Sequence, residues 1–184
     1  MTTANDPKKA GPTRLDETSL SMDVRTAIDG TVKRTIRAQL GGEVFTTRPI
    51  WEGAASTMEV PPFAEALRVA LIASYAAMGL VSDYARKLRG DGVSWSEIFP
   101  LLGLEDIEGR AKHEAAYEFI LGPDTREFRF DERYVYWACG SCTQGVRDRG
   151  PYNGHPADNE TGHAEDCARH QAEIDAYMSH YEDE

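Results

Sequence analysis

Apolar side chains recur every four residues in the first part of the chain. This spacing forms a slanting stripe on one face of an α-helix and predicts a helix from about Met22 to Leu40. Two glycines follow, which is a common way for a helix to end. Residues 1–20 mix small, charged and helix-breaking side chains, so we expect a disordered tail there. The stripe consists of Val24, Ile28, Val32, Ile36 and Leu40.

A second, longer apolar pattern predicts a helix from Phe63 to about Arg89. It is apolar nearly all round between Val69 and Val81, so we expect a buried helix at the centre of a helical domain. The apolar run is 13 residues long. A membrane span needs roughly 20, so no membrane contact is expected. Residues 43–60 are expected to be an irregular segment that packs on the core.

The stretch from Ser94 to Glu97 is typical of a helix start. In such a capping box the serine hydroxyl accepts the glutamate amide, and the glutamate carboxylate accepts the serine amide. It predicts a short helix to about Leu102, followed by a further helix from about Asp106 to Leu121. Together with the first two helices these complete a helical domain over residues 21–122, and a domain boundary is expected near residues 122–127.

The pattern then changes to an aromatic, strand-like stretch from Phe128 to Trp137, with a second short strand at Gly145–Asp148. Residues 149–162 are rich in turn-forming types and read as a loop, in which Asp158, Asn159 and Glu160 are expected to solvate the loop or cap the next helix. An amphipathic helix follows from about His163 to Tyr181, with Ile174, Tyr177 and Met178 turned inward. The sequence therefore predicts a small ββα-like module over residues 128–184.

All three cysteines of the chain fall inside this module, and histidines lie near the third. Cys139 and Cys142 are separated by two residues, a spacing that lets a tight knuckle aim both thiolates at one metal ion. Cys167 is the third candidate ligand. Thiolate and imidazole ligands at these spacings are typical of a structural Zn²⁺ site. The competing interpretation is three ordinary buried thiols with surface histidines.

Either His163 or His170 can be the fourth ligand. His163 precedes Cys167 by four residues, one turn of the expected helix, whereas His170 follows it by three. We prefer His163, and His155 is more remote in the loop.

Four protein ligands close the coordination sphere, whereas catalytic zinc keeps a position for water. We therefore expect no enzyme, with a metal-dependent hydrolase or nuclease as the third interpretation of the chain's function.

Charge argues against most contacts with nucleic acid. The formal net charge is −11, and residues 155–184 alone hold nine acidic residues against one arginine. Phosphates should be repelled by such a chain. Residues 1–50 are the exception, with eight Lys and Arg against six Asp and Glu. The candidate nucleic-acid-binding residues are Arg25, Lys33, Arg34 and Arg37 on the first helix, and Arg110 and Lys112 further on.

The segment 84–121 resembles the helix-turn-helix of many actinobacterial regulators. The matching residues are Ser94, Trp95, Glu97, Ile98, Leu101, Leu102 and Gly103. The C-terminal run around Cys139, Cys142, His163 and Cys167 is similar to the tail of uncharacterised actinobacterial proteins that combine these two parts. The resemblance implies an architecture and no particular activity. Pro100 and the acidic Glu105, Asp106 and Glu108 depart from the pattern, because a helix in the major groove normally brings basic or amide side chains to the bases.

The fold class expected is mainly α: a helical domain with a degenerate helix-turn-helix, followed by the zinc-binding module. The function expected is that of a regulatory or adaptor protein that contacts other proteins, with a transcription complex as one setting. The alternative is a DNA-binding transcriptional regulator that uses the helix-turn-helix or the basic N-terminal helix. The chain shows no export signal and three cysteines at metal-ligand spacing, so a reducing cytoplasm is the expected compartment.

Overall fold

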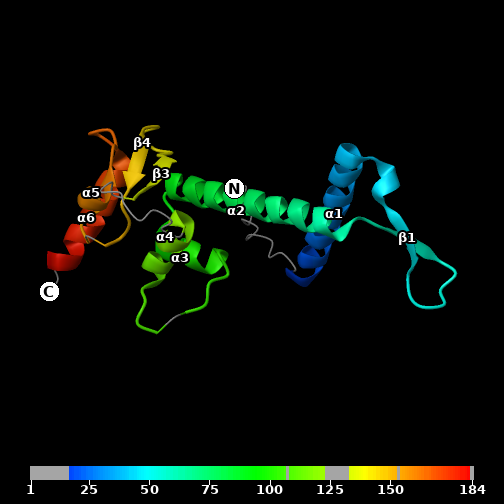
Figure 1. Ribbon diagram of the computed structural model, residues 1–184. Helices are drawn as coiled ribbons and strands as arrows, with labels where there is room; N and C mark the ends of the chain where they lie inside the picture. The colour runs from blue at the N-terminus through cyan, green and yellow to red at the C-terminus, as the bar shows by residue number, and fades with distance from the viewer. Residues whose placement is uncertain (1–16, 107, 123–132, 153, 183–184) are drawn as a thin grey trace, which may run out of the picture. The chain divides into compact units, whose positions relative to one another are not determined.

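The computed structural model describes residues 17–106, 108–122, 133–152 and 154–182, and it is mainly helical (Figure 1). Its packing divides the chain into two compact units, Met1–Ala76 and Ala77–Glu184, and each is described by itself. Residues 1–16 of the expected N-terminal tail lie outside the described residues, whereas Glu17 to Leu20 are helical.

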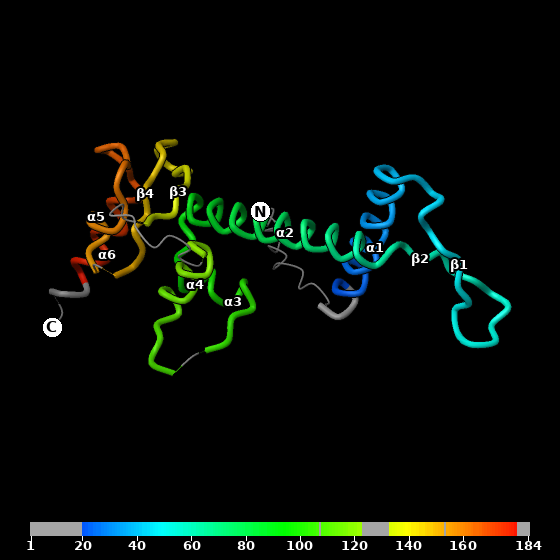
Figure 2. The backbone as a smooth tube through the Cα atoms, in the orientation of Figure 1, coloured from blue at the N-terminus to red at the C-terminus, as the bar shows by residue number. Residues whose placement is uncertain are grey.

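The first unit begins with helix α1, Glu17–Leu40, which confirms the helix that the four-residue spacing predicts. A short 3₁₀ turn, Gly42–Val44, leads into strands β1, Thr46–Pro49, and β2, Thr57–Val60. The two strands form an antiparallel hairpin, which Figure 2 shows as a narrow loop of chain. The expectation of an irregular segment here was wrong. Threonine residues in both strands, and Val60 in β2, favour extended backbone.

Helix α2, Phe63–Gly90, has the bounds that the sequence predicts, but it is not a buried core helix. Leu67, Ile72 and Tyr75 are 71%, 67% and 68% exposed, and the described buried residues of α2 are Ala85, Arg89 and Gly90, near its end. By length and composition α2 is apolar enough to cross a membrane. An apolar pattern all round a helix records hydrophobicity alone, so it cannot distinguish a buried helix from one whose surface lacks a partner.

The second unit contains helices α3, Trp95–Leu101, and α4, Lys112–Leu121. The capping box is confirmed: the Glu97 amide donates to Ser94 Oγ at 3.3 Å, and the Ser94 amide donates to Glu97 Oε2 at 2.8 Å. Helix α4 starts later than predicted, which leaves Glu105 and Asp106 ahead of it. Residues 102–111 join the two helices, a longer connection than the turn of about three or four residues in a helix-turn-helix.

A three-stranded antiparallel sheet completes the second unit. Its order is β3 (Val135–Ala138), β4 (Gly145–Asp148) and β5 (Glu160–Thr161). Strand β4 has the predicted bounds, but β5 and the short helix α5, Pro156–Asn159, fall in the expected loop. Helix α6, Ala168–Glu182, begins after Cys167, later than predicted. Ile174 and Tyr177 are half-buried, whereas Met178 is 48% exposed. Phe128 and Phe130 lie outside the described residues.

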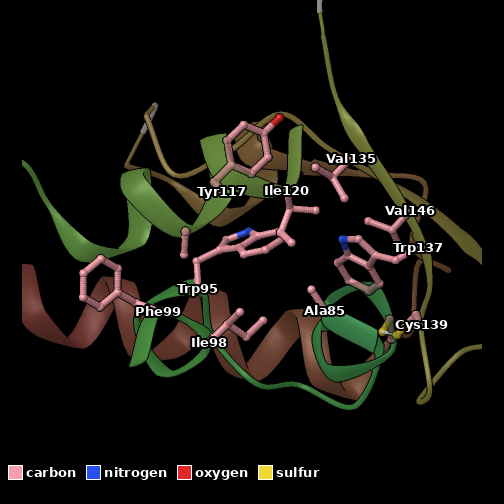
Figure 3. Packing of buried hydrophobic residues seen from close by; sticks show 12 residues of the cluster. Ala85, Trp95, Ile98, Phe99, Tyr117, Ile120, Val135, Trp137, Cys139 and Val146 are labelled. Atoms are coloured by element: carbon pink, nitrogen blue, oxygen red, sulfur yellow. Dashed lines mark hydrogen bonds between the residues drawn. The ribbon is translucent and has the colours of Figure 1, made fainter. Parts of the chain in front are cut away.

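One hydrophobic core joins the helices and the sheet of the second unit (Figure 3). Trp95 and Ile98 lie in it, with exposed fractions of 4% and 1%, as does Tyr117 of α4, whose ring meets Trp95 edge-on at 5.5 Å. From the C-terminal part the core receives Trp137 of β3 and the thiol of Cys139. Residues on both sides of the expected boundary near 122–127 therefore share one core, and the observed division lies within α2 instead.

Candidate metal centre

The first two candidate ligands come from a knuckle between β3 and β4. The Cys139 amide donates to the Gln144 carbonyl at 2.9 Å, and the Thr143 amide donates to the Cys139 carbonyl at 2.8 Å. Thr143 has a φ of 61°, the left-handed conformation that such a tight reversal requires. These bonds fold the backbone back on itself, so that the side chains of Cys139 and Cys142 turn to one side.

The knuckle is anchored to the end of helix α2. The Gly140 amide donates to the Gly90 carbonyl at 2.8 Å. A Cβ atom on Gly90 would lie only 2.4 Å from the carbonyl oxygen of Ala138. Glycine at position 90 is therefore required by the close approach of two backbones, and the approach fixes the position of the knuckle in the core.

The other two candidate ligands, His163 and Cys167, come from the segment between β5 and α6. The Cys167 amide donates to the Ala164 carbonyl at 3.0 Å, and the Cys167 carbonyl accepts the Gln171 amide at 2.9 Å. Cys167 thus lies at the junction of a turn and helix α6. From their spacing in the sequence, these two ligands were expected one turn apart on the final helix. That expectation was wrong, because the helix begins only at Ala168.

The structure brings the four predicted side chains to one point. One ligand atom from each of Cys139, Cys142, His163 and Cys167 lies within 4.8 Å of the others. Cys139 Sγ and Cys167 Sγ are 3.8 Å apart, and His163 Nδ1 is 3.8 Å from Cys142 Sγ and 3.4 Å from Cys167 Sγ. Zinc–ligand bonds in a tetrahedron imply about 3.8 Å between two sulfurs and about 3.6 Å between sulfur and nitrogen. The cluster can therefore hold a metal ion.

Backbone amides favour the ligating form of Cys142. Hydrogen bonds from Ala164, and then from Gln144, lower the pKa of its thiol to about 6. The pKa of Cys167 is raised, chiefly because this side chain is buried. A metal ion requires deprotonated thiolates and supplies the positive charge that a buried thiolate lacks. The donor set thus fits a cation better than it fits three neutral thiols.

The carboxylate of Glu160 holds the imidazole of His163. Glu160 Oε2 lies 3.1 Å from His163 Nε2, and the two side chains are 5% and 3% exposed. A hydrogen bond at Nε2 places the proton there and leaves the Nδ1 lone pair facing the sulfurs. Metal-ligating histidines commonly have such a carboxylate partner, which fixes the tautomer and raises the basicity of the ligating nitrogen. For Glu160, the expectation that it solvates the loop or caps the next helix was wrong, because its side chain is buried against His163.

Glu160 belongs to a buried network of charges. Burial would raise the pKa of Glu160, but the guanidinium groups of Arg89 and Arg169 outweigh burial and lower this pKa. Arg89, 5% exposed, forms an ion pair with Glu160 and lies 3.6 Å from Asp148. Asp148 accepts the indole N–H of Trp95 at 2.9 Å. The network thus connects the candidate metal ligand His163 to helices α2 and α3.

The sequence pattern did not identify these network residues. Arg89 is the last arginine of an apolar helix, a position where the sequence predicts a side chain in solvent. In the structure its guanidinium is buried between the carboxylates of Asp148 and Glu160. The one available signal was Glu160, which precedes the candidate ligand His163 by three residues. The pairing of Arg89 with Asp148 and Glu160 depends on tertiary contacts, which no local spacing predicts.

His170, the alternative ligand, stacks on His163 instead of joining the four-atom cluster. Their ring centroids are 4.3 Å apart, with 14° between the ring planes. Burial is the main reason that the pKa of His170 is lowered. His170 also belongs to a second group with Glu160 and His163 whose polar atoms lie within 4.8 Å of one another. His155 instead caps α5, since its Nδ1 accepts the Ala157 amide at 3.2 Å.

Most of the candidate nucleic-acid-binding residues are engaged by acidic or hydroxyl groups. Lys33 lies 2.7 Å from Asp29, and Arg37 lies 2.6 Å from Glu59. The remaining pairs are Arg110 with Glu118, Lys112 with Asp106 at 3.1 Å, and Arg34 with the hydroxyl of Thr31 at 2.9 Å. Arg25 is exposed on α1. Five of the six candidate side chains thus have an acidic or hydroxyl partner among the described residues.

Comparisons with protein-family models, with curated proteins and with solved structures found no match for this chain.

Proposed function

We propose that the protein is a non-enzymatic, zinc-stapled regulatory or adaptor protein that acts through contacts with other proteins. One observation carries the proposal: two of the candidate ligands, Cys139 and Cys167, are part of the hydrophobic core of the second unit. A metal ion at this place ties the knuckle between β3 and β4 to the start of α6. Its contribution is then to folding, as in small zinc modules.

The donor set favours zinc over other common ions. Three sulfurs and one imidazole nitrogen are soft and borderline ligands, which disfavours magnesium and calcium. The spacing of the ligand atoms fits a tetrahedron. A cytoplasmic setting, in which thiols stay reduced, is part of the same proposal.

A catalytic role finds less support at this site. Four protein ligands leave no position for a water molecule. The carboxylate beside the site, that of Glu160, is paired with His163 and Arg89, which disfavours its use as a general base. Cobalt substitution distinguishes the two roles: a tetrahedral absorption spectrum supports the structural site, and a five-coordinate spectrum supports a hydrolase.

DNA binding is the second candidate function, and the packed pair of helices α3 and α4 favours it. Trp95 and Ile98, which carry the likeness to a helix-turn-helix, are buried and hold these helices in the core. Such a pair can equally be kept for packing. Retention on duplex DNA that falls steeply with salt would favour the regulator, whereas capture of a protein partner without such retention favours the adaptor.

Metal content tests the proposal first. We expect one zinc per chain in untagged protein purified without chelator, and thiols that react only after the metal is removed. Absence of metal, together with freely reactive thiols in the folded protein, would contradict it. The same preparation then serves for the DNA and partner experiments, so that failure to bind either ligand is not confused with loss of the zinc.

A further inference from the structure

The three cysteines of the candidate metal centre differ in their access to solvent. Cys139 and Cys167 are 2% and 3% exposed and belong to the hydrophobic core of the second unit. Cys142 is half-buried and packs against that core from outside it. The chain has no cysteine besides these three. A small solute in water therefore reaches the sulfur of Cys142 more readily than the other two.

The accessible sulfur has two further sulfurs beside it. The ligand atoms of the cluster all lie within 4.8 Å of one another, so Cys142 Sγ is within this distance of both buried Sγ atoms. When a peroxide oxidises a thiolate, the first product is a sulfenic acid, which condenses with a nearby thiol to form a disulfide. Without such a thiol, oxidation continues to irreversible acids. The cluster thus holds both parts of a reversible oxidation, an accessible sulfur and a buried resolving sulfur.

We propose that the candidate metal centre is a peroxide-sensitive switch, in which oxidation of Cys142 forms a disulfide with Cys139 or Cys167 and expels the metal ion. The inference rests on the proposed function, because it assigns regulation to the same site. The oxidant is hydrogen peroxide or another small peroxide. Such a molecule reaches a half-buried sulfur that the bulkier reagents used to titrate thiols do not reach, so the thiols of the loaded protein stay protected from those reagents.

The reaction has two steps. The Cys142 thiolate attacks one oxygen of hydrogen peroxide, which forms an S–O bond, breaks the O–O bond and releases hydroxide. The thiolate of Cys139 or Cys167 then attacks the Cys142 sulfur, which forms the S–S bond, breaks the S–O bond and releases a second hydroxide. Two electrons pass from the two sulfurs to the peroxide, and two protons from solvent convert both hydroxides to water.

Formation of the disulfide removes two of the four ligands. The thiolate is the form of cysteine that binds a metal ion, and a disulfide holds none. One cysteine and His163 remain, whereas structural zinc sites are almost always four-coordinate. Disulfides in a reducing compartment are usually transient. Reduction there returns both cysteines to the form that binds the metal, so the switch is reversible.

Access and proximity predict different disulfides, which makes the proposal testable. Cys139 Sγ and Cys167 Sγ are 3.8 Å apart, so proximity alone favours a bond between these two buried sulfurs. The proposed reaction begins instead at the sulfur that solvent reaches. We therefore expect Cys142 in the disulfide that forms first.

Peroxide treatment of the zinc-loaded full chain tests the switch. A coloured chelator follows zinc release, while free thiols are alkylated at the same time points and mapped by mass spectrometry. We expect zinc to leave in step with the loss of two thiols, one of them Cys142 from the earliest time point. A phosphine reductant with added zinc should restore the loaded protein. Retention of zinc under peroxide, or a first disulfide between Cys139 and Cys167, would overturn the proposal.

The variant Cys142→His keeps a metal-binding side chain but removes the accessible sulfur. The ratio of zinc release with peroxide to release without it should fall by about tenfold or more, because the remaining sulfurs are buried. An unchanged ratio would overturn the proposal. Zinc content of the variant is measured first, and if it binds none, the thiol map of the natural chain decides. A natural chain without zinc contradicts the proposed function itself, whereas a loaded chain that peroxide leaves intact overturns only the switch.

Discussion

Glu160 Oε2 lies 3.1 Å from His163 Nε2, on the side of the imidazole ring opposite the three sulfurs. The pair converts a neutral ring with two alternative tautomers into a ligand that presents Nδ1 to the metal position. Because Glu160 is itself held by buried arginines, the orientation of the ring is determined by residues well outside the ligand set.

Glu160→Gln should weaken metal binding by roughly 10–100-fold, because the amide accepts a weaker hydrogen bond from His163. Competition with a coloured chelator measures the affinity. Glu173→Gln is the matched control, since Glu173 pairs with Arg169 at 2.8 Å but is not among the described partners of His163. Equal losses in the two variants would show that the network acts only through general stability.

His163→Ala and His170→Ala should behave differently, because only His163 places a nitrogen in the four-atom cluster. We expect His163→Ala to lose stoichiometric zinc, as measured by elemental analysis. His170→Ala should keep the metal and lose only the stacked ring. Retention of zinc by His163→Ala together with its loss from His170→Ala would exchange the two assignments.

Gly90→Ala should destabilise the second unit by about 1–3 kcal/mol, the usual cost of overpacking. The added methyl group would lie 2.4 Å from the Ala138 carbonyl oxygen and push the knuckle away from α2. Gly30→Ala on α1 is the control, because its new Cβ would meet only the end of Arg34, at 3.7 Å. That change should stabilise α1 by about 0.5–1 kcal/mol. Denaturant unfolding measures both, and equal effects would contradict the close approach at Gly90.

Tyr117→Phe should alter stability mainly at alkaline pH. Burial first, and then the negative charge of Asp148, raises the pKa of the Tyr117 hydroxyl well above its usual value of 10.0. The unfolded chain releases this proton near pH 10 while the folded chain keeps it. Stability is therefore fully present below pH 10 and is lost as the pH rises toward the folded pKa.

The phenylalanine variant removes that titration, so its free energy of unfolding should fall less steeply above pH 10. At pH 8 it should be less stable by about 1 kcal/mol, because the hydroxyl donates to the Asp148 carbonyl at 3.0 Å. Urea unfolding between pH 8 and 11 provides both values. Parallel pH profiles for the two proteins would show that Tyr117 ionises normally in the folded state.

Local chemistry explains what could be predicted from the sequence. The capping box at Ser94 and Glu97 involves neighbouring residues, and the knuckle of Cys139 and Cys142 involves a single turn, so both are present in the structure as expected. The bounds of α2 follow from its composition and its terminal glycine. The exposure of the α2 side chains could not be predicted in this way, because the hydrophobicity of a helix does not indicate which segments pack against it.

Contacts between distant segments account for what could not be predicted. Strand β5 has two residues and pairs with β4 through Arg147 and Asp148, too short a segment to leave a periodic pattern. The pairing of Arg89 with Glu160 joins positions far apart in the chain. His163 was expected on a helix because its spacing to Cys167 equals one helical turn, whereas a turn closed by Ala164 and Cys167 brings the same two side chains together.

The hydrogen bond from the Gly140 amide to the Gly90 carbonyl gives helix α2 an unusual end. The last carbonyl groups of a helix are normally satisfied by residues that follow directly, or by water. Here the donor belongs to the loop that carries Cys139 and Cys142, two of the candidate metal ligands. Any change that displaces this loop therefore also removes the donor and should fray α2 from its C-terminal end.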